Sequence, residues 1–177
     1  MLGIVFSEFI EMVESTFSMD MVDDIIDAAE IESGGSYTSV GYYSHVEILK
    51  LVTALSEKTG TPVPDLIHAF GNYLFSRFIE RYPVFFEGVE HSIDFLETIE
   101  NHIHVEVKKL YPEAELPTFE CRRMDDGSFE MIYRSSRPLA DLAQGLMNGC
   151  IEHYQDTYTI SRTNQDDGSV RFLLIPQ

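Results

Sequence analysis

The sequence has no tryptophan, only two cysteines among its 177 residues, and no long uncharged apolar run. Cys121 and Cys150 are too few for a disulfide framework and lack the CxxC spacing of zinc and redox sites, which favours a reducing cytoplasm. No basic region precedes an apolar run at the start, and Glu8 and Glu11 follow closely, so no signal peptide is expected. No stretch approaches the roughly 20 apolar residues that span a bilayer. We therefore expect a soluble, cytoplasmic protein.

Basic residues are also scarce. The chain has 12 Lys and Arg against 30 Asp and Glu, a formal net charge of −18 at pH 7. This charge repels phosphate backbones and anionic lipid head groups, which makes nucleic acids and membrane surfaces poor partners. Apolar residues are plentiful, at 44% of the chain, with twelve Phe and nine Tyr. A chain of this size can bury a core without disulfides, and we expect one domain over residues 1–177.

Apolar residues at helical spacing dominate the N-terminal two-thirds of the chain. Ser44 is a suitable N-cap for one helix, which Gly60 ends, and Pro64 suits the first turn of the next. The expected helices cover about residues 3–17, 19–29, 45–59, 64–81 and 91–110.

From Thr118 the pattern changes to period two, typical of strands. Two turns, Asp125-Asp126-Gly127 and Asp166-Asp167-Gly168, each predict a hairpin. The first hairpin ends near Ser136, Pro138 opens a helix to about Tyr154, and the last two strands cover about residues 157–163 and 169–175. The predicted class is α+β, with a helical N-terminal part packed on a four-stranded antiparallel sheet that has one inserted helix.

Two histidines lie on the helix expected over residues 91–110. At roughly 100° per residue, the rings of His102 and His104 point about 200° apart, so they cannot share a metal ion. His104 lies about 20° beyond the edge of the apolar arc, whereas His102 falls on the polar side. The arc comprises Ile93, Leu96, Ile99, Ile103, Val107 and Leu110. His104 is therefore the residue expected to face inward.

Two interpretations of His104 remain open on this pattern. A histidine at the core edge that hydrogen-bonds a carbonyl is the simpler one. The functional interpretation is a single neutral imidazole without a second protein ligand, which suits an axial bond to heme iron because the porphyrin supplies the other nitrogens.

A second group consists of Tyr133, Ser135 and Arg137, spaced two residues apart near a strand end. Period two places all three on one face, in a row about 13 Å long. Together they can receive two carboxylates, with a bidentate contact from Arg137, and the two propionates of heme are such a pair. The alternative is an ordinary solvated strand edge.

These two motifs resemble one family, the heme nitric oxide/oxygen binding (H-NOX) domains, related to the heme domain of soluble guanylate cyclase. Its tyrosine-x-serine-x-arginine signature stands at Tyr133, Ser135 and Arg137, and its proximal histidine at His104, ahead of Tyr111-Pro112. The resemblance covers nearly the whole chain. It implies a single sensor domain with no catalytic activity that buries heme b within the fold.

The resemblance also implies roles for individual residues. His104 would ligate the iron, Tyr133, Ser135 and Arg137 would hold the propionates, and Pro117 would press on the porphyrin. The residues implied to line the opposite, distal side are Ile4 or Val5, Phe78, Leu142 and Leu146.

Family members that bind oxygen resemble one another in carrying a distal tyrosine five residues after the signature arginine. This chain has Leu142 at that position. Bound oxygen carries partial negative charge and gains from a hydrogen bond, whereas nitric oxide and carbon monoxide bind ferrous heme without one. Nitric oxide is therefore the expected signal, with carbon monoxide as a further ligand.

The resemblance further implies that nitric oxide weakens the bond between iron and His104 and so releases the helix that carries this residue. The implied partner is a sensor histidine kinase or a cyclic-di-GMP enzyme, a diguanylate cyclase or phosphodiesterase. Two other classes stay open: a metal-dependent hydrolase, for which no HExxH spacing is present, and a cofactor-free interaction module with an aromatic helix.

Overall fold

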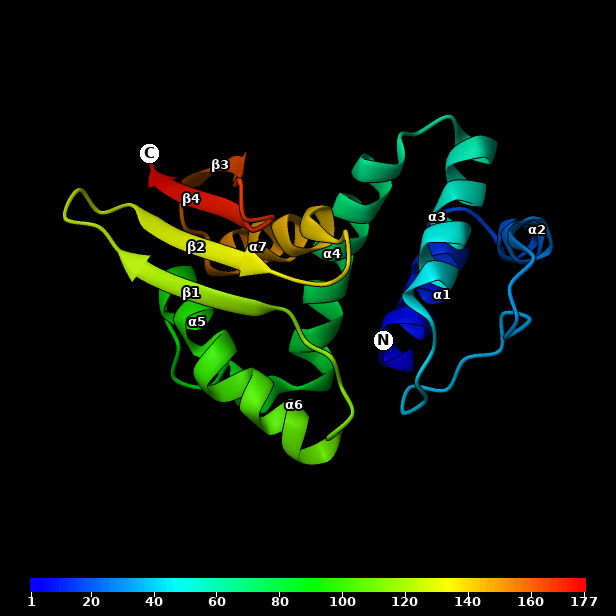
Figure 1. Ribbon diagram of the computed structural model, residues 1–177, viewed down its shortest axis with the longest axis horizontal. Helices are drawn as coiled ribbons and strands as arrows, with labels where there is room; N and C mark the ends of the chain where they lie inside the picture. Colours follow the sequence, from blue (N-terminus) through cyan, green and yellow to red (C-terminus); the bar gives the residue numbers. More distant parts are fainter.

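The computed structural model describes residues 1–177 and has the predicted α+β architecture (Figure 1). Its elements along the chain are α1 (Gly3–Thr16), α2 (Met19–Ala29), α3 (His45–Thr59), α4 (Val63–Arg81), η1 (Pro83–Phe85), α5 (Ser92–Thr98), η2 (Ile99–Ile103), α6 (His104–Leu110), β1 (Thr118–Arg123), β2 (Phe129–Arg134), α7 (Ala140–Tyr154), β3 (Tyr158–Asn164) and β4 (Val170–Pro176).

The N-terminal helices begin and end at the residues that their local chemistry indicates. Ser18 caps α2 by accepting a hydrogen bond from the Met21 N–H at 3.1 Å, and Ser44 caps α3 through the Val46 N–H at 3.3 Å. Gly60, with φ of 74°, ends α3 in the left-handed conformation that glycine adopts without strain. These three predicted boundaries are therefore confirmed.

The four strands form one antiparallel sheet in the order β1-β2-β4-β3. Each predicted hairpin is present, with Gly127 and Gly168 at φ of 83° and 82° in the two turns. Tyr133 on β2 pairs with Phe119 on β1 and with Val170 on β4. The signature tyrosine is thus in an inner strand, paired on both sides.

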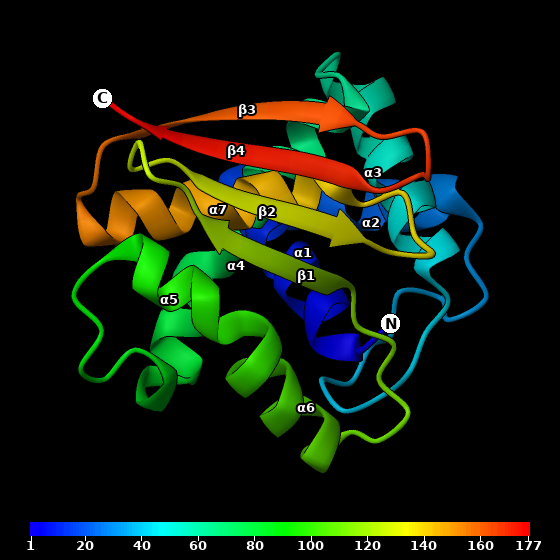
Figure 2. The same cartoon turned by 60° about the vertical axis from the view of Figure 1, so that its left-hand side comes forward.

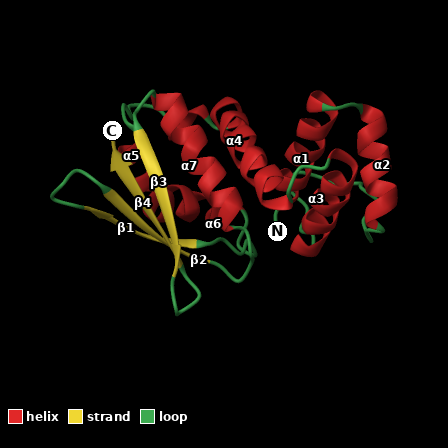
Figure 3. Ribbon diagram, turned by 90° about the horizontal axis from the view of Figure 1, so that it is seen from above, coloured by secondary structure: helices red, strands yellow, loops and turns green.

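Two apolar cores lie on either side of α4 (Figure 3). One joins α1, α2, α3 and most of α4, and the other joins the sheet to α5, α7 and the end of α4. Leu146 on α7 packs against both cores. The structure thus consists of a helical layer and a sheet layer with α4 and α7 between them.

Glycines allow α4 and α7 to cross with their backbones in close contact. A Cβ atom on Gly71 would lie 2.4 Å from the Leu142 carbonyl oxygen, and one on Gly145 would lie 2.1 Å from the His68 carbonyl oxygen. Since such contacts are far inside van der Waals distance, neither position accommodates a larger residue without a shift of the helices. This crossing fixes where the first turn of α7, with Leu142, faces α4.

A buried carboxylate joins α1 to the C-terminal half of α4. Glu8 is 0% exposed, and its two oxygens lie 2.7 Å from Arg77 Nε and 2.5 Å from Arg81 Nε. Glu11, one turn further along α1 and 46% exposed, contacts the same two arginines. Because a buried carboxylate is stable only with such partners, Glu8 fixes these two helices against one another.

Three predicted details are wrong. The helix α7 begins at Ala140 and not at Pro138, since Pro138 lies in the turn that precedes its cap residue, Leu139. The strand β2 ends at Arg134, before Ser136, because its pairing with β1 runs out there. Leu110, placed in the apolar arc by its spacing, is 74% exposed because α6 ends there.

The structure contains no helix that is both long and apolar enough to cross a membrane.

Candidate functional site

His104 is the first residue of α6 and follows directly on a π-helical turn. The turn η2 separates α5 from α6, and the His104 N–H donates to the Ile99 carbonyl, five residues earlier. The prediction of a regular helix over residues 91–110 is therefore wrong in its middle. Such turns arise where tertiary contacts override the local pattern, and they are frequent at functional sites. Here Glu100, within the turn, bonds to the neighbouring strand.

The two histidines of this segment differ in exposure as their angular spacing predicts. The His104 side chain is 15% exposed, and its ring centroid lies 6.0 Å from that of Phe119 on β1. His102 is exposed, with the edge of its ring against Phe85 at 5.8 Å. In Figure 2, α5 and α6 run beside β1, so this side of the segment faces the sheet edge.

The surroundings of His104 favour its neutral form. Burial lowers the pKa of His104 below its ordinary value, although a hydrogen bond with Glu100 acts in the opposite direction. Nδ1 of His104 lies 3.2 Å from Oε2 of Glu100. An imidazole that is neutral at physiological pH has a lone pair available for a metal ion.

The signature residues lie together at the end of β2, but not all in the strand. Tyr133 is in the strand and 5% exposed, whereas Ser135 and Arg137 lie in the turn beyond it. The Ser135 hydroxyl accepts a hydrogen bond from the Arg137 N–H at 3.1 Å. Burial raises the pKa of Tyr133, with opposing effects from a hydrogen bond to Ser135 and the charge of Arg137. The expected straight row is thus a compact cluster, because the strand ends too early.

Arg137 already binds a carboxylate. Its side chain is 11% exposed, and its guanidinium donates to the Glu115 carbonyl at 2.8 Å and to Glu115 Oε2 at 2.6 Å. The Glu115 side chain is itself 75% exposed. A well-buried guanidinium bonded to an exposed surface carboxylate can exchange it for the carboxylate of a ligand.

Pro117 lies between the two groups described so far. It is half-buried in the segment that leads into β1, two residues after Glu115 and two before Phe119. Glu115 bonds to Arg137, and the Phe119 N–H bonds to Glu100 beside His104. One short segment therefore connects the imidazole to the arginine.

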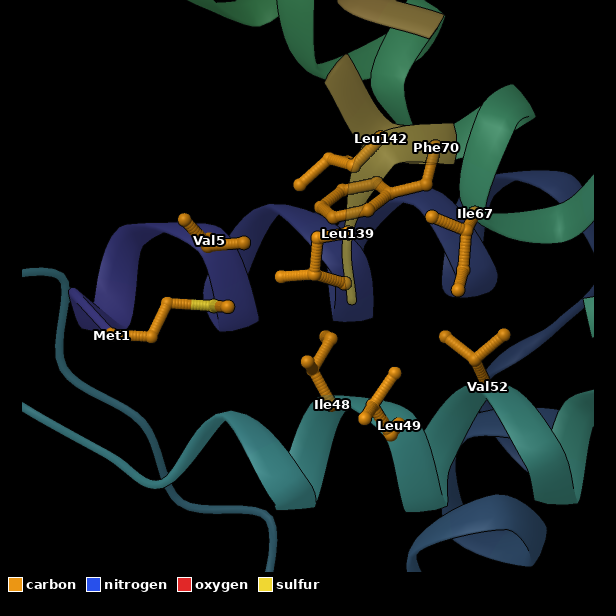
Figure 4. Close-up of a pocket in the computed structure, with 9 residues that line it drawn as sticks. All are labelled: Met1, Val5, Ile48, Leu49, Val52, Ile67, Phe70, Leu139 and Leu142. Atoms are coloured by element: carbon orange, nitrogen blue, oxygen red, sulfur yellow. The ribbon is translucent and has the colours of Figure 1, made fainter. Parts of the chain in front are cut away.

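An apolar pocket lies between α1, α3, α4 and the start of α7. All nine residues that line it are hydrophobic, and the α3 side chains face the others across it (Figure 4). They are Met1, Val5, Ile48, Leu49, Val52, Ile67, Phe70, Leu139 and Leu142. None of these nine side chains carries a hydrogen-bond donor.

The pocket includes only part of the set expected on the distal side. Val5 and Leu142 line it, whereas Ile4, Phe78 and Leu146 do not. Phe78 and Leu146 pack against the helical core, as Val5 and Leu142 also do, and Ile4 is half-buried. The distal roles of these five residues stay a prediction. The sequence predicted the lining residues from α3 only as the apolar face of a helix. Their spacing is the same whether that face lines a pocket or packs in a core.

These residues fit a heme. One imidazole that is neutral and largely buried suits an axial position, a tyrosine, a serine and an arginine suit two propionates, and apolar and aromatic walls suit a porphyrin. Arg137 holding the Glu115 carboxylate is an observed instance of the contact that a propionate would make. The candidate site therefore meets the chemical requirements of a heme-binding site.

Comparison of the sequence with known families identifies the family to which the chain belongs. A family described as haem-NO-binding matches residues 2–162. The chain therefore belongs to the haem-NO-binding, or H-NOX, family of heme-based gas sensor domains.

Curated relatives that match are much longer proteins. Soluble guanylate cyclase gcy-35 of Caenorhabditis elegans is 22% identical over 174 residues, which cover 93% of this chain and 25% of that protein. Soluble guanylate cyclase 89Db of Drosophila melanogaster is 32% identical over 87 residues, 48% of this chain and 13% of that protein. The chain thus spans a quarter or less of their length.

Solved structures of similar length match over the whole chain. The Fe(II) unliganded H-NOX protein from K. algicida is 41% identical, with a TM-score of 0.91, covering 100% of this chain and 97% of that one. The H-NOX from Shewanella woodyi in the Fe(II)CO state is 42% identical, with a TM-score of 0.86 and coverage of 100% and 95%. An H-NOX protein from S. oneidensis, at 24% identity and a TM-score of 0.92, shares the fold.

Proposed function

We propose that this chain forms a single sensor domain over residues 1–177 that binds heme b through His104 and responds to nitric oxide. The observation that carries the choice of gas is the apolar pocket that includes Leu142, since its nine lining residues are all hydrophobic. Oxygen on ferrous heme gains from a hydrogen-bond donor, whereas nitric oxide and carbon monoxide do not need one. The proposed ligand is nitric oxide, with carbon monoxide as a second one.

In this proposal the chain's own residues bind and orient the cofactor. When bound, heme supplies a ferrous iron with an open position for a diatomic gas. His104 holds the iron, and Tyr133, Ser135 and Arg137 receive the propionates. Arg137 would then exchange the exposed carboxylate of Glu115 for a propionate. Pro117, in the segment between these groups, would press on the porphyrin.

The proposed signal is a movement of α6. Release of His104 from the iron would loosen this helix, because the imidazole is one of the contacts that hold its start against β1. Val105 and Leu110 on α6 are 44% and 74% exposed, so a shift of the helix changes a surface that another protein contacts. The proposed readers are a sensor histidine kinase, a diguanylate cyclase or a phosphodiesterase, and the domain itself has no catalytic activity. A cytoplasmic location is part of the proposal, since Cys121 and Cys150 are free thiols.

Substitution of Leu142 tests the choice of gas. In Leu142→Tyr a phenol enters the apolar pocket, and we expect the ferrous protein to bind oxygen in air, because the hydroxyl can donate to the bound gas. Leu142→Phe adds the same ring without the hydroxyl and should resemble the wild-type protein. The measurement is the absorption spectrum of each reduced protein under argon and then in air.

Two results would contradict the proposal. Stable oxygen binding by the wild-type protein would show that an apolar pocket does not exclude oxygen. Equal gain of oxygen binding in the Tyr and Phe variants would show that pocket volume, and not a hydrogen-bond donor, limits it.

A further inference from the structure

We propose that Glu100 is a positioning residue for the iron ligand, whose carboxylate holds the imidazole of His104 in one tautomer and orientation and strengthens its bond to iron. This inference rests on the proposed ligation of heme by His104.

The tautomer follows from the contact between the two side chains. Oε2 of Glu100 lies 3.2 Å from Nδ1 of His104. An ionised carboxylate only accepts hydrogen bonds, so Nδ1 must carry the hydrogen, and in a neutral imidazole Nε2 then keeps a free lone pair. Glu100 thereby leaves Nε2 as the one nitrogen of this ring that can bind iron.

The position of Glu100 is fixed from a second side. The same oxygen, Oε2, accepts the backbone N–H of Phe119 at 3.1 Å. β1 is an edge strand, so an N–H that points away from β2 needs a partner outside the sheet. Glu100 supplies that partner from within the π-helical turn, and the strand in return holds the carboxylate against the imidazole.

Other ion pairs already attach this helical segment to the sheet, so attachment alone does not explain the position of Glu100. Arg123 on β1 bonds to Glu97 at 2.8 Å and 2.7 Å and to Asp94 at 2.6 Å. Those two carboxylates already join α5 to the strand. Glu100 is the next acidic residue along the segment, and its carboxylate contacts His104.

A carboxylate bonded to the distant nitrogen of a ligating histidine raises the basicity of the nitrogen that binds the metal. Loss of such partners typically weakens metal binding by roughly 10- to 100-fold. In a sensor that works by release of a histidine, the same bond sets how readily the histidine leaves. Glu100 would therefore set the threshold of the response as well as the retention of heme.

The test compares Glu100→Gln with Glu97→Gln in the heme-loaded protein. Each substitution removes one negative charge from the same helical segment, but only the first touches His104. The readouts are the iron–histidine stretching frequency of the ferrous protein by resonance Raman spectroscopy and the rate of heme transfer to excess apomyoglobin. For Glu100→Gln we expect a lower frequency and heme loss about tenfold faster, with Glu97→Gln unchanged.

A second variant separates the contact of Glu100 with the strand from its contact with His104. Gln keeps an oxygen for the Phe119 N–H, whereas Glu100→Ala removes the acceptor and should lower the frequency further. A Glu100→Gln protein with the wild-type frequency and a heme loss rate within twofold of wild type would overturn the inference. The same shift in Glu97→Gln would also overturn it, because the effect would then be general electrostatics. A wild-type protein without any iron–histidine band would instead contradict the proposed ligation itself.

Discussion

Replacing His104 by glycine is expected to abolish retention of heme, and added imidazole is expected to restore it. In the proposed site this side chain is the only protein ligand to iron, and a glycine leaves a space in which free imidazole can take its place. The measurement is the ratio of Soret to protein absorbance after gel filtration, with and without imidazole. We expect the ratio to fall by at least tenfold without imidazole and to recover with it.

His102→Gly is the matched control for this experiment. It makes the same substitution two residues away in the same segment, at an exposed histidine. We expect His102→Gly to keep its heme and its ferrous spectrum. Retention of heme by His104→Gly, with a normal content and no need for imidazole, would contradict the assignment of His104. Loss of heme in both variants would point to disruption of the helical segment and not to a lost ligand.

Replacing Glu8 by alanine is expected to destabilise the fold by about 3 kcal/mol, because it removes the one buried partner of two arginines and leaves them with exposed carboxylates only. Glu8 is 0% exposed, while Arg77 and Arg81 remain 25% and 36% exposed and can recover some hydration. That partial exposure places the expected loss at the lower end of the range for buried pairs. Urea unfolding of the heme-loaded protein, followed by circular dichroism, measures the change.

Glu11→Ala is the control, because Glu11 contacts the same two arginines from the surface. We expect it to change the free energy of unfolding by less than about 1 kcal/mol, as exposed pairs do. Equal effects of the two substitutions would contradict the view that burial of Glu8, and not the number of ionic contacts, fixes α1 against α4.

The layout of the fold could be predicted because its signals are local. Ser44, Gly60 and the two Asp-Asp-Gly turns specify where the backbone changes direction through caps and positive φ angles. The order of the strands was not predictable in the same way. β4 lies between β2 and β3, an arrangement decided by how the two hairpins pack over α7, and no local pattern carries that information.

The inward position of His104 could be predicted, whereas its role as the iron ligand stays a prediction. His104 follows from the apolar arc and from the family signature. The π-helical turn before it could not be predicted from periodicity, and Glu100 within the turn bonds to a strand that the chain reaches only at Phe119. Contacts between residues 19 positions apart leave no periodic trace in the sequence.

The lining of the apolar pocket was the least predictable feature. Val5 and Leu142 line the apolar pocket and Phe78 and Leu146 do not, although all four are apolar, lie on helices and pack against the same core. Periodicity identifies the inward face of a helix, and it does not tell whether that face meets another side chain or a cavity. The close crossing of α4 and α7 at Gly71 and Gly145, which places Leu142 against α4, is a property of two helices together.

The most direct test of the central claim is the absorption spectrum of the reduced, heme-loaded protein under argon, in air and with nitric oxide. The claim is that His104 holds a ferrous heme beside an apolar pocket that admits nitric oxide and disfavours oxygen. It predicts a spectrum that is the same in argon and in air, and a Soret shift to a five-coordinate form with nitric oxide. A stable oxygen-bound spectrum in air, or a protein that takes up no heme, would contradict it.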